Sequence, residues 1–246
     1  MLSKEEQERY DRQIIMRGIG EEGQEKLKRA KIVIAGSGGL GSPVATYLAA
    51  AGVGTLRIID HDKVELSNLN RQILHWDKDI GTDKVVSARE KLTSLNNNVQ
   101  IEAINDTIDE SNVLSLVKGF DVIIDAMDNL ETRFLLNSTA IELNIPFIHG
   151  AIYGFEGRAT TIIPGKTACL RCIYQGIAPK EKFPVIGVVP GIIGCIEASE
   201  ALKYLLHIGT LLSNRLLMFN GLSMKFTELP IKRNPSCEHC GHLQGE

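Results

Sequence analysis

A glycine-rich turn between an apolar strand and a helix constrains the fold of this chain most. The strand KIVIA at 31–35 runs into GSGGLG at Gly36–Gly41, and the spacing predicts a helix over about 39–51. Glycines let the backbone turn tightly and approach phosphate, and the amides at the start of the helix favour negative charge. The next strand, 55–60, ends in Asp60, where this fold places a carboxylate that accepts hydrogen bonds from a ribose hydroxyl. This order predicts an adenine-nucleotide site and leaves NAD, FAD and ATP open.

The alternation of strands and helices up to about residue 150 predicts a parallel sheet covered on both faces. We expect strands at 31–35, 55–60, 99–104, 121–125 and 146–150, and helices at 3–15, 20–29, 39–51, 83–95, 109–118 and about 130–143. Beyond residue 150, strands at 158–163 and within 216–229, with a long helix at about 190–207, indicate antiparallel additions to the same sheet. The fold class is therefore α/β: a Rossmann-like open twisted sheet whose parallel N-terminal part is extended by antiparallel C-terminal strands. The segment 61–82 is polar and irregular, and we expect a mobile loop at about 174–190.

Charge and hydropathy exclude several partners. The net charge is 27 − 30 = −3 without a basic block, which gives little electrostatic footprint for nucleic acid. No apolar run reaches the length of a membrane span, and the polar, acidic start MLSKEEQERY is unlike a signal peptide. We therefore expect a cytoplasmic protein with no nucleic-acid or membrane partner.

Four of the five cysteines form two CxxC pairs. Each pair places two thiolates on one tight turn, which suits a tetrahedral zinc site. The candidate ligands are Cys169, Cys172, Cys237 and Cys240. The 64 residues at 173–236 that separate the pairs are too many for a small autonomous finger, so such a site would clamp the C-terminal tail onto the body. Four thiolates leave no open coordination position, which favours a structural zinc over a catalytic one.

Other interpretations of the cysteines stay open at this point. The four thiols could form surface disulfides, although a reducing cytosol disfavours them, or be unrelated to one another. His239 or His242 could replace a cysteine as ligand. The fifth cysteine, Cys195, lies in the apolar stretch GVVPGIIGCIEASEALKYLL, and we expect it to be buried.

Three charged residues go beyond what an NAD site needs. Arg71 lies just beyond Asn68 in the polar segment, Lys84 starts a predicted helix, and Asp128 comes three residues after a predicted strand end. An acid that holds Mg²⁺ and cations that neutralise phosphate are what nucleotidyl transfer requires. Each residue also has an ordinary interpretation, as a solvated surface charge or a helix N-cap. Their coincidence with the glycine loop favours ATP.

The motifs together resemble the ThiF/MoeB/HesA family, the prokaryotic relatives of ubiquitin-activating E1 enzymes, over nearly the whole chain. The residues that carry the resemblance are Gly36–Gly41, Asp60-x-Asp62, Ser67-Asn68-Leu69-Asn70-Arg71-Gln72, Lys84, Asp125-x-x-Asp128-Asn129, Arg133, Tyr10-Asp11-Arg12-Gln13 and both CxxC pairs. The resemblance implies an ATP-dependent adenylyltransferase that activates the C-terminal glycine of a ubiquitin-like (ThiS/MoaD-type) sulfur-carrier protein ending in Gly-Gly. A sulfurtransferase is a further candidate partner.

The resemblance also assigns roles to residues. Gly38, Gly39 and Gly41 would contact phosphate and Asp60 the ribose, while Asn68, Arg71 and Lys84 would surround the triphosphate and Asp128 would hold Mg²⁺. Further nucleotide-binding candidates are Gly36, Asp62, Gln72, Asn129 and Arg133. Arg12 would reach into the site of a neighbouring subunit, which requires a homodimer; without the resemblance it is an ordinary exposed charge. The chain 1–246 would then be one adenylation domain, with a nucleotide-binding half (1–150) and a zinc-containing, carrier-binding half (151–246).

One departure from the family concerns a covalent step. Several members carry a loop cysteine shortly before a Gly-Val-x-x-Pro-like run, and in this chain Phe183 stands at that place. Adenylation is supported, and a thioester or persulfide step on this chain is not. Alternatives in the same enzyme class are a peptide C-terminus or a modified tRNA base as acceptor. An NAD-dependent oxidoreductase and a non-catalytic nucleotide-binding scaffold are the alternatives from other classes.

Overall fold

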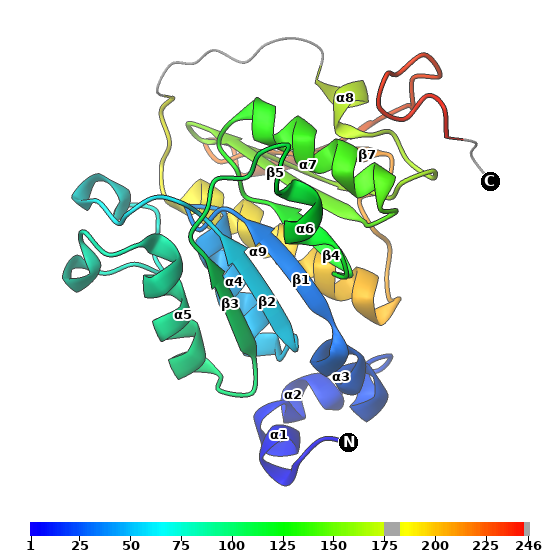
Figure 1. The fold of residues 1–246 in the computed structure, drawn as a ribbon. Helices are drawn as coiled ribbons and strands as arrows, with labels where there is room; N and C mark the ends of the chain where they lie inside the picture. Colours follow the sequence, from blue (N-terminus) through cyan, green and yellow to red (C-terminus); the bar gives the residue numbers. More distant parts are fainter. Residues whose placement is uncertain (175–182, 244–246) are drawn as a thin grey trace.

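A computed structural model of the chain describes residues 1–174 and 183–243. The described residues form one eight-stranded sheet in the order β3-β2-β1-β4-β5-β6-β7-β8 (Figure 1). The strands are β1 (Lys31–Ala35), β2 (Thr55–Ile59), β3 (Gln100–Ile104), β4 (Val122–Asp125), β5 (Phe147–Tyr153), β6 (Glu156–Ile162), β7 (Arg215–Asn220) and β8 (Lys225–Pro230).

The sheet has a parallel part and an antiparallel part. Strands β1 to β5 pair in parallel, and β6, β7 and β8 are added in antiparallel pairs from β5 outward. The parallel strands carry Val and Ile runs with buried residues on both faces, as expected for strands covered on both sides by helices. The predicted Rossmann-like sheet with antiparallel C-terminal strands is confirmed.

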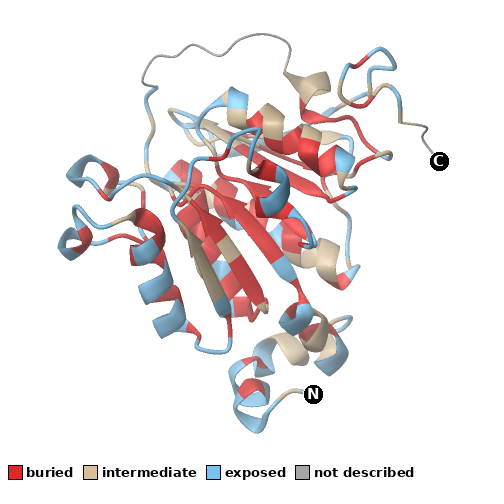
Figure 2. Cartoon of the chain, in the orientation of Figure 1, coloured by how far each residue is buried: buried red, intermediate tan, exposed pale blue. Residues whose placement is uncertain are grey.

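Helices cover both faces of this sheet (Figure 1). They are α1 (Lys4–Arg9), α2 (Asp11–Ile14), α3 (Gly20–Arg29), α4 (Gly41–Ala51), α5 (Lys84–Leu95), α6 (Val113–Val117), α7 (Leu130–Glu142), α8 (Leu170–Ile173) and α9 (Val188–Leu206), with 3₁₀ turns at Leu66–Asn68 and Asp77–Asp79. One core lies between the sheet and α3, α4, α5 and α9, and includes Val44, Leu48, Leu92 and Ile193. The other lies beneath α6, α7 and α8, and includes Val117, Leu136, Phe147 and Leu170. Figure 2 shows buried residues continuing across the central strands.

Several boundaries differ from the sequence prediction. Helix α6 is shorter than 109–118 because Asp109 and Asn112 form a local turn that bonds its own backbone. Strand β5 runs past residue 150 to Tyr153 because it pairs with β6 in a hairpin. Of the predicted mobile segment 174–190, residues 175–182 lie outside the described residues, Val185 forms a bridge to Gly154, and the last three belong to α9.

The prediction that Cys195 is buried is wrong, because its side chain is exposed. Helix α9 buries Ile193, Glu197 and Ala201 against the sheet. Cys195 lies two residues, or about 200° of helical rotation, from both Ile193 and Glu197, and so faces away from them. Among the described residues, no helix is long and apolar enough to cross a membrane.

Candidate functional site

Two glycines allow the loop after β1 to fold tightly against the turn after β4. Gly36 has φ = 103°, and a Cβ at this residue would lie 2.6 Å from the Ala126 carbonyl oxygen. A Cβ on Gly41 would lie 2.0 Å from the Gly36 carbonyl oxygen. Neither position can hold a larger residue without moving the backbone. The glycines therefore bring the start of α4 and its free amides to the carboxyl end of β1 and β4.

Asp60 fixes the same loop from the end of β2. Its Oδ2 accepts a hydrogen bond from the Ser37 amide at 2.8 Å, and its Oδ1 accepts one from the Asp62 amide at 2.9 Å. A carboxylate can accept about four hydrogen bonds, so capacity remains for a ligand hydroxyl. The predicted ribose-binding carboxylate thus lies directly beside the glycine loop.

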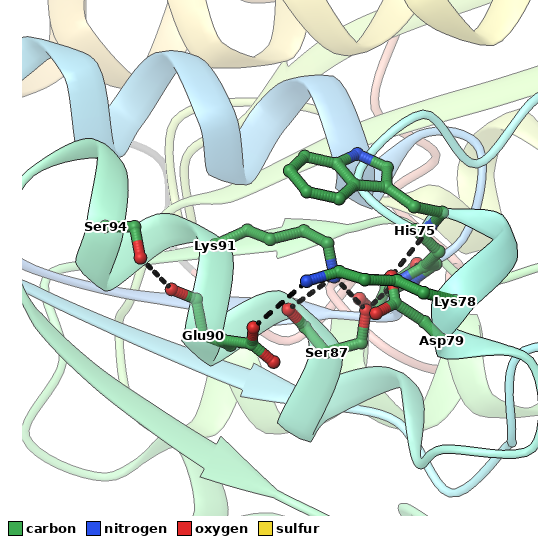
Figure 3. A network of polar contacts seen from close by, with 9 residues as sticks. His75, Lys78, Asp79, Ser87, Glu90, Lys91 and Ser94 are labelled. Carbon is green, nitrogen blue, oxygen red and sulfur yellow. Dashed lines mark hydrogen bonds and ion pairs between the residues drawn. The ribbon is translucent and has the colours of Figure 1, made fainter.

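A buried polar network, drawn in Figure 3, joins this loop to α5. His75 bonds the Ser37 carbonyl through Nε2 at 3.0 Å and the Ser87 hydroxyl through Nδ1 at 2.9 Å. Lys91 donates to the Ser87 hydroxyl at 2.8 Å and pairs with the buried Asp79. Burial lowers the pKa of His75, so the ring is neutral and its Nε2–H donates to the carbonyl. The network orders the polar segment 61–82 against the glycine loop, and no sequence motif predicted it.

The predicted phosphate-binding cations lie in this segment (Arg71) and at the start of α5 (Lys84). Lys84 is buried, and its Nζ lies 2.8 Å from Oδ2 of Asp62. The Arg71 guanidinium donates to the Ser67 carbonyl at 3.0 Å and to Oδ1 of Asn70 at 3.1 Å. A Cβ on Gly39 would lie 3.6 Å from Cγ of Arg71, so the Arg71 side chain lies beside the glycine loop.

Three polar atoms beside the loop are buried without a hydrogen-bond partner among the described residues. They are the hydroxyls of Ser37 and Ser42 and Oε1 of Gln72. Buried polar atoms normally have partners, so an unpartnered cluster is the expected appearance of a ligand site. Asn68, another predicted site residue, is buried, and its Oδ1 accepts a hydrogen bond from the Glu65 amide at 3.0 Å. These residues have the chemistry to hold the phosphates and ribose of ATP.

The turn after β4 carries the predicted Mg²⁺ ligand. Asp128 is exposed, and Asn129 rather than Asp128 caps α7, because its side chain accepts from the Thr132 amide at 2.9 Å. Arg133 is turned inward: its Nε donates to the Met127 carbonyl at 3.1 Å. The structure thus brings Asp128 to the same edge of the sheet as the glycine loop and uses Arg133 to hold the backbone of the turn.

Arg12 is not brought to this edge. It is exposed on α2, and the neighbouring Gln13 donates to the carbonyl of Ala51, the last residue of α4. The glycine loop lies at the other end of α4, whose 11 residues span about 16 Å. The N-terminal helices lie at the start of β1 (Figure 1). Arg12 therefore cannot complete the site of its own chain in this arrangement.

The four predicted zinc ligands lie close together beside α7, where α8 meets the C-terminal segment. Their sulfur atoms all lie within 4.8 Å of one another, with 3.6 Å between Cys169 and Cys237 and between Cys172 and Cys240. Zn–S bonds of about 2.3 Å in a tetrahedron require about 3.8 Å between sulfurs, so this set fits zinc. Burial raises the pKa of the Cys169 thiol and, to about 11, that of Cys240, and a divalent cation would favour their ionised forms.

The C-terminal segment lies beside α8 at this cluster, where the sequence predicts that a zinc would clamp it (Figure 1). His239 is not among the clustered ligands; its ring Nδ1 lies 3.2 Å from the Asn137 amide nitrogen. Arg171 on α8 pairs with Glu238 at 2.6 Å and adds a second link. His242 is not part of the cluster either.

The model of the ThiF family matches residues 10–239 of the chain. The chain is 45% identical over 240 residues to the SAMP-activating enzyme E1 of Haloferax volcanii, covering 95% of this chain and 88% of that protein. It is 41% identical over 250 residues to the sulfur carrier protein adenylyltransferase of Thermus thermophilus, covering 97% and 92%. It is also 39% identical to adenylyltransferase and sulfurtransferase MOCS3-1 of Zea mays, covering 95% of this chain and 51% of that protein.

Solved structures of the same fold include MccB of E. coli. The crystal structure of MccB with ATP superposes with a TM-score of 0.82 at 26% identity, covering 89% of this chain and 68% of that one. The structure of MccB with selenomethionine MccA gives a TM-score of 0.86 at 25% identity, covering 98% and 76%.

Proposed function

The chain belongs to the ThiF family, and on that basis we propose that it is an ATP-dependent adenylyltransferase that activates the C-terminal glycine carboxylate of a ubiquitin-like sulfur-carrier protein. The observation that carries the proposal is the 45% and 41% identity, over nearly the full length of both chains, to relatives named for this activity. The peptide-type alternative has only the more distant likeness to MccB in its favour.

In the proposed reaction, an oxygen of the carrier carboxylate attacks the α-phosphorus of ATP. The new P–O bond forms as the bond to the bridging oxygen of the β-phosphate breaks, and pyrophosphate leaves with that electron pair. The attacking carboxylate and the α-phosphate are both anionic, so cations must offset the repulsion between them. Arg71 and Lys84 supply positive charge beside the glycine loop, and the salt bridge to Asp62 holds Lys84 in place.

Asp128 is the carboxylate proposed to hold Mg²⁺. Its exposure at the carboxyl end of the sheet, where ligands of open α/β folds bind, supports this role. Bound Mg²⁺ would neutralise charge on the leaving pyrophosphate. Asp60, Asn68, Gln72 and the glycines are proposed to hold the nucleotide itself.

A homodimer is proposed to complete the site. Arg12 lies at the opposite end of α4 from the glycine loop of its own chain, so a catalytic role requires a second copy. Ile15 and Met16, which follow it, are 66% and 54% exposed, as expected for side chains that another subunit covers.

The C-terminal half is proposed to bind the carrier. The β7–β8 hairpin exposes Leu222 and Met224 in its turn and Phe226 and Leu229 on β8, the outermost strand of the sheet. Sulfur transfer would fall to a separate sulfurtransferase, since Phe183 occupies the place of the loop cysteine.

Isotope exchange between labelled pyrophosphate and ATP tests the proposed function. We expect exchange with the purified chain and a Gly-Gly-terminated β-grasp carrier, and none with a carrier that lacks the last glycine. Exchange that needs only a free peptide would replace the carrier with a peptide substrate. Absence of exchange with every carrier encoded by the same genome would contradict the proposal.

A further inference from the structure

A hydrogen-bonded series of three polar side chains, two of them fully buried and one partly buried, runs through the core beneath α7. The Tyr174 hydroxyl lies 3.0 Å from Nε2 of His149, and Nδ1 of the same ring lies 2.6 Å from Oδ2 of Asp125. The second carboxylate oxygen, Oδ1, accepts a hydrogen bond from the Met127 amide at 3.1 Å. Asp125 and His149 are 0% exposed. The nucleotide-site assignments above account for none of these contacts.

The direction of each hydrogen bond follows from the burial of the imidazole. Burial lowers the pKa of His149, although Asp125 opposes this, so the ring is neutral. Its Nδ1–H donates to the carboxylate, which leaves Nε2 to accept from the Tyr174 hydroxyl. The two hydrogen bonds therefore run in one direction: Tyr174 donates to His149, and His149 donates to Asp125.

At one end of this hydrogen-bonded series, Asp125 bonds the turn that carries Asp128. Asp125 fixes the Met127 amide, and Arg133 donates to the Met127 carbonyl and, at 3.1 Å, to the Gly150 carbonyl. Both polar groups of the Met127 residue are thus bonded to side chains on the buried side. The position of Asp128, the next residue, depends on these bonds.

At the other end of the series, Tyr174 adjoins the helical turn that carries two of the clustered cysteines. Tyr174 is the C-cap of α8, a single helical turn that begins after Cys169 and contains Cys172. The turn that presents two of the four thiols is therefore linked through two side chains to the turn that presents the proposed Mg²⁺ ligand.

We propose that His149 and Tyr174 are positioning residues for adenylation, which set the backbone of residues 126–129 by tying it to the cysteine-bearing turn α8. The inference rests on the proposed function for its catalytic consequence. A phenylalanine could fill the volume of Tyr174 equally well, so the hydroxyl matters only through its hydrogen bond. Removing it leaves the acceptor Nε2 buried without a partner, which loosens the imidazole and then the turn.

The first test compares Tyr174→Phe with Tyr204→Phe as a matched control. The Tyr204 hydroxyl makes no hydrogen bond with the described residues, and that side chain is also partly buried. We expect hydrogen exchange of the amides at 126–130 to accelerate roughly two- to tenfold in Tyr174→Phe, the scale of one lost hydrogen bond, and to stay unchanged in the control. Zinc content should remain that of the wild type. In pyrophosphate exchange, kcat should fall and the Mg²⁺ concentration for half-maximal rate should rise, while KM for the carrier stays constant.

The second test uses His149→Asn, alone and combined with Tyr174→Phe. An asparagine amide can still donate to Asp125 but cannot reach Tyr174, so both single variants break the same link. The double variant should therefore exchange its 126–130 amides as His149→Asn does. Wild-type amide exchange in Tyr174→Phe, or additive effects in the double variant, would overturn the proposal. A wild-type chain without pyrophosphate exchange would instead contradict the proposed function, and the amide-exchange comparison would still decide the positioning role.

Discussion

At the scale of single residues, Glu197 is the most unusual side chain of the core. It is 0% exposed on α9, and neither carboxylate oxygen has a hydrogen-bond partner among the described residues. Its carboxyl carbon occupies the space beside Gly150, where a Cβ would lie 2.5 Å away. Burial raises the pKa of Glu197 well above its usual value; Asp125 on β4 adds to this, and Arg133 on α7 opposes it. The group is therefore a neutral acid over a wide pH range.

This burial makes stability depend on pH. The same carboxyl ionises near pH 4.5 in the unfolded chain, and only at higher pH in the folded one. Above pH 4.5 the unfolded state binds fewer protons, so the free energy of unfolding falls as pH rises, by up to about 1.4 kcal/mol per pH unit, until the folded pKa is passed. Glu197→Gln removes this slope. Urea unfolding of both proteins should give equal free energies of unfolding near pH 4.5 and a higher one for Glu197→Gln at neutral pH. A difference between the two proteins that does not change with pH would contradict the raised pKa of Glu197.

Asp128 gives the sharpest test of the nucleotide site. Asp128→Ala should lower carrier-dependent pyrophosphate exchange by about two orders of magnitude, the scale for removing one preorganised electrostatic group. The matched control is Glu110→Ala, an exposed acid on the loop before α6. Near wild-type exchange in Asp128→Ala would contradict the proposed role in holding Mg²⁺.

The sequence could predict those site residues that stand at fixed places in a motif, next to the end of a strand or the start of a helix. The glycine loop, Asp60, Lys84 and Asp128 all follow strand ends or begin helices, so their meeting at one sheet edge follows from the order of elements. The buried polar side chains near the site could not be predicted this way. His149 lies within a strand and Glu197 within a long helix, and only the packing of β4, β5 and α9 shows that both lie close to Asp125.

At the scale of elements, the short turn α8 depends on the C-terminal segment. Its two cysteines meet Cys237 and Cys240, which follow β8 and lie in the same core as α7. A four-residue helix has little stability of its own, so a metal that joins it to the tail would supply most of its order.

Cys240→Ser should therefore remove zinc and destabilise the fold. We expect one zinc per chain in the wild type, almost none in the variant, and a Tm lower by at least about 5 °C, since each kcal/mol is worth roughly 2–4 °C at this size. Cys195→Ser, which alters an exposed cysteine outside the cluster, is the control. Unchanged zinc content and Tm in Cys240→Ser would show that the four thiols do not form one site.

Hydrophobic runs and turn residues sufficed to predict most elements. All five strands expected before residue 150 are present, because Val and Ile runs bounded by Gly, Asp and Asn leave few alternatives. The errors have three separate causes. Pairing with β6 extends β5, and local side-chain bonds shorten α6. The first nine residues of α9, VVPGIIGCI, are apolar on all sides, so no hydrophobic period showed that Cys195 faces outward.

At the scale of the whole molecule, the role proposed for Arg12 would make activity a property of a pair of subunits. Arg12→Ala and Asp128→Ala should each be inactive. A mixed dimer of the two contains one site that lacks both groups and one that keeps both. Subunit exchange between the two variants should therefore restore up to about half of the wild-type pyrophosphate exchange per mixed dimer.

The other possible roles of Arg12 give different results. If Arg12 served its own chain, every site in the mixture would lack one group and no activity would return. If it were a solvated surface charge, Arg12→Ala alone would be fully active. Arg17→Ala is the matched control, because Arg17 is exposed on the same segment, and it should behave as the wild type.

The place of β1 in the sheet has a consequence for synthesis of the chain. Ile32 pairs with Leu56 on one side and with Val122 on the other, and the second partner comes 122 − 32 = 90 residues later. At roughly 5–20 residues per second, a ribosome needs about 5–18 s to make that length. Throughout this interval the nascent chain carries an apolar strand with one open edge, which can pair with a neighbouring chain. We expect chaperones that cover this edge during translation, rather than the stability of the finished fold, to limit the yield of soluble protein.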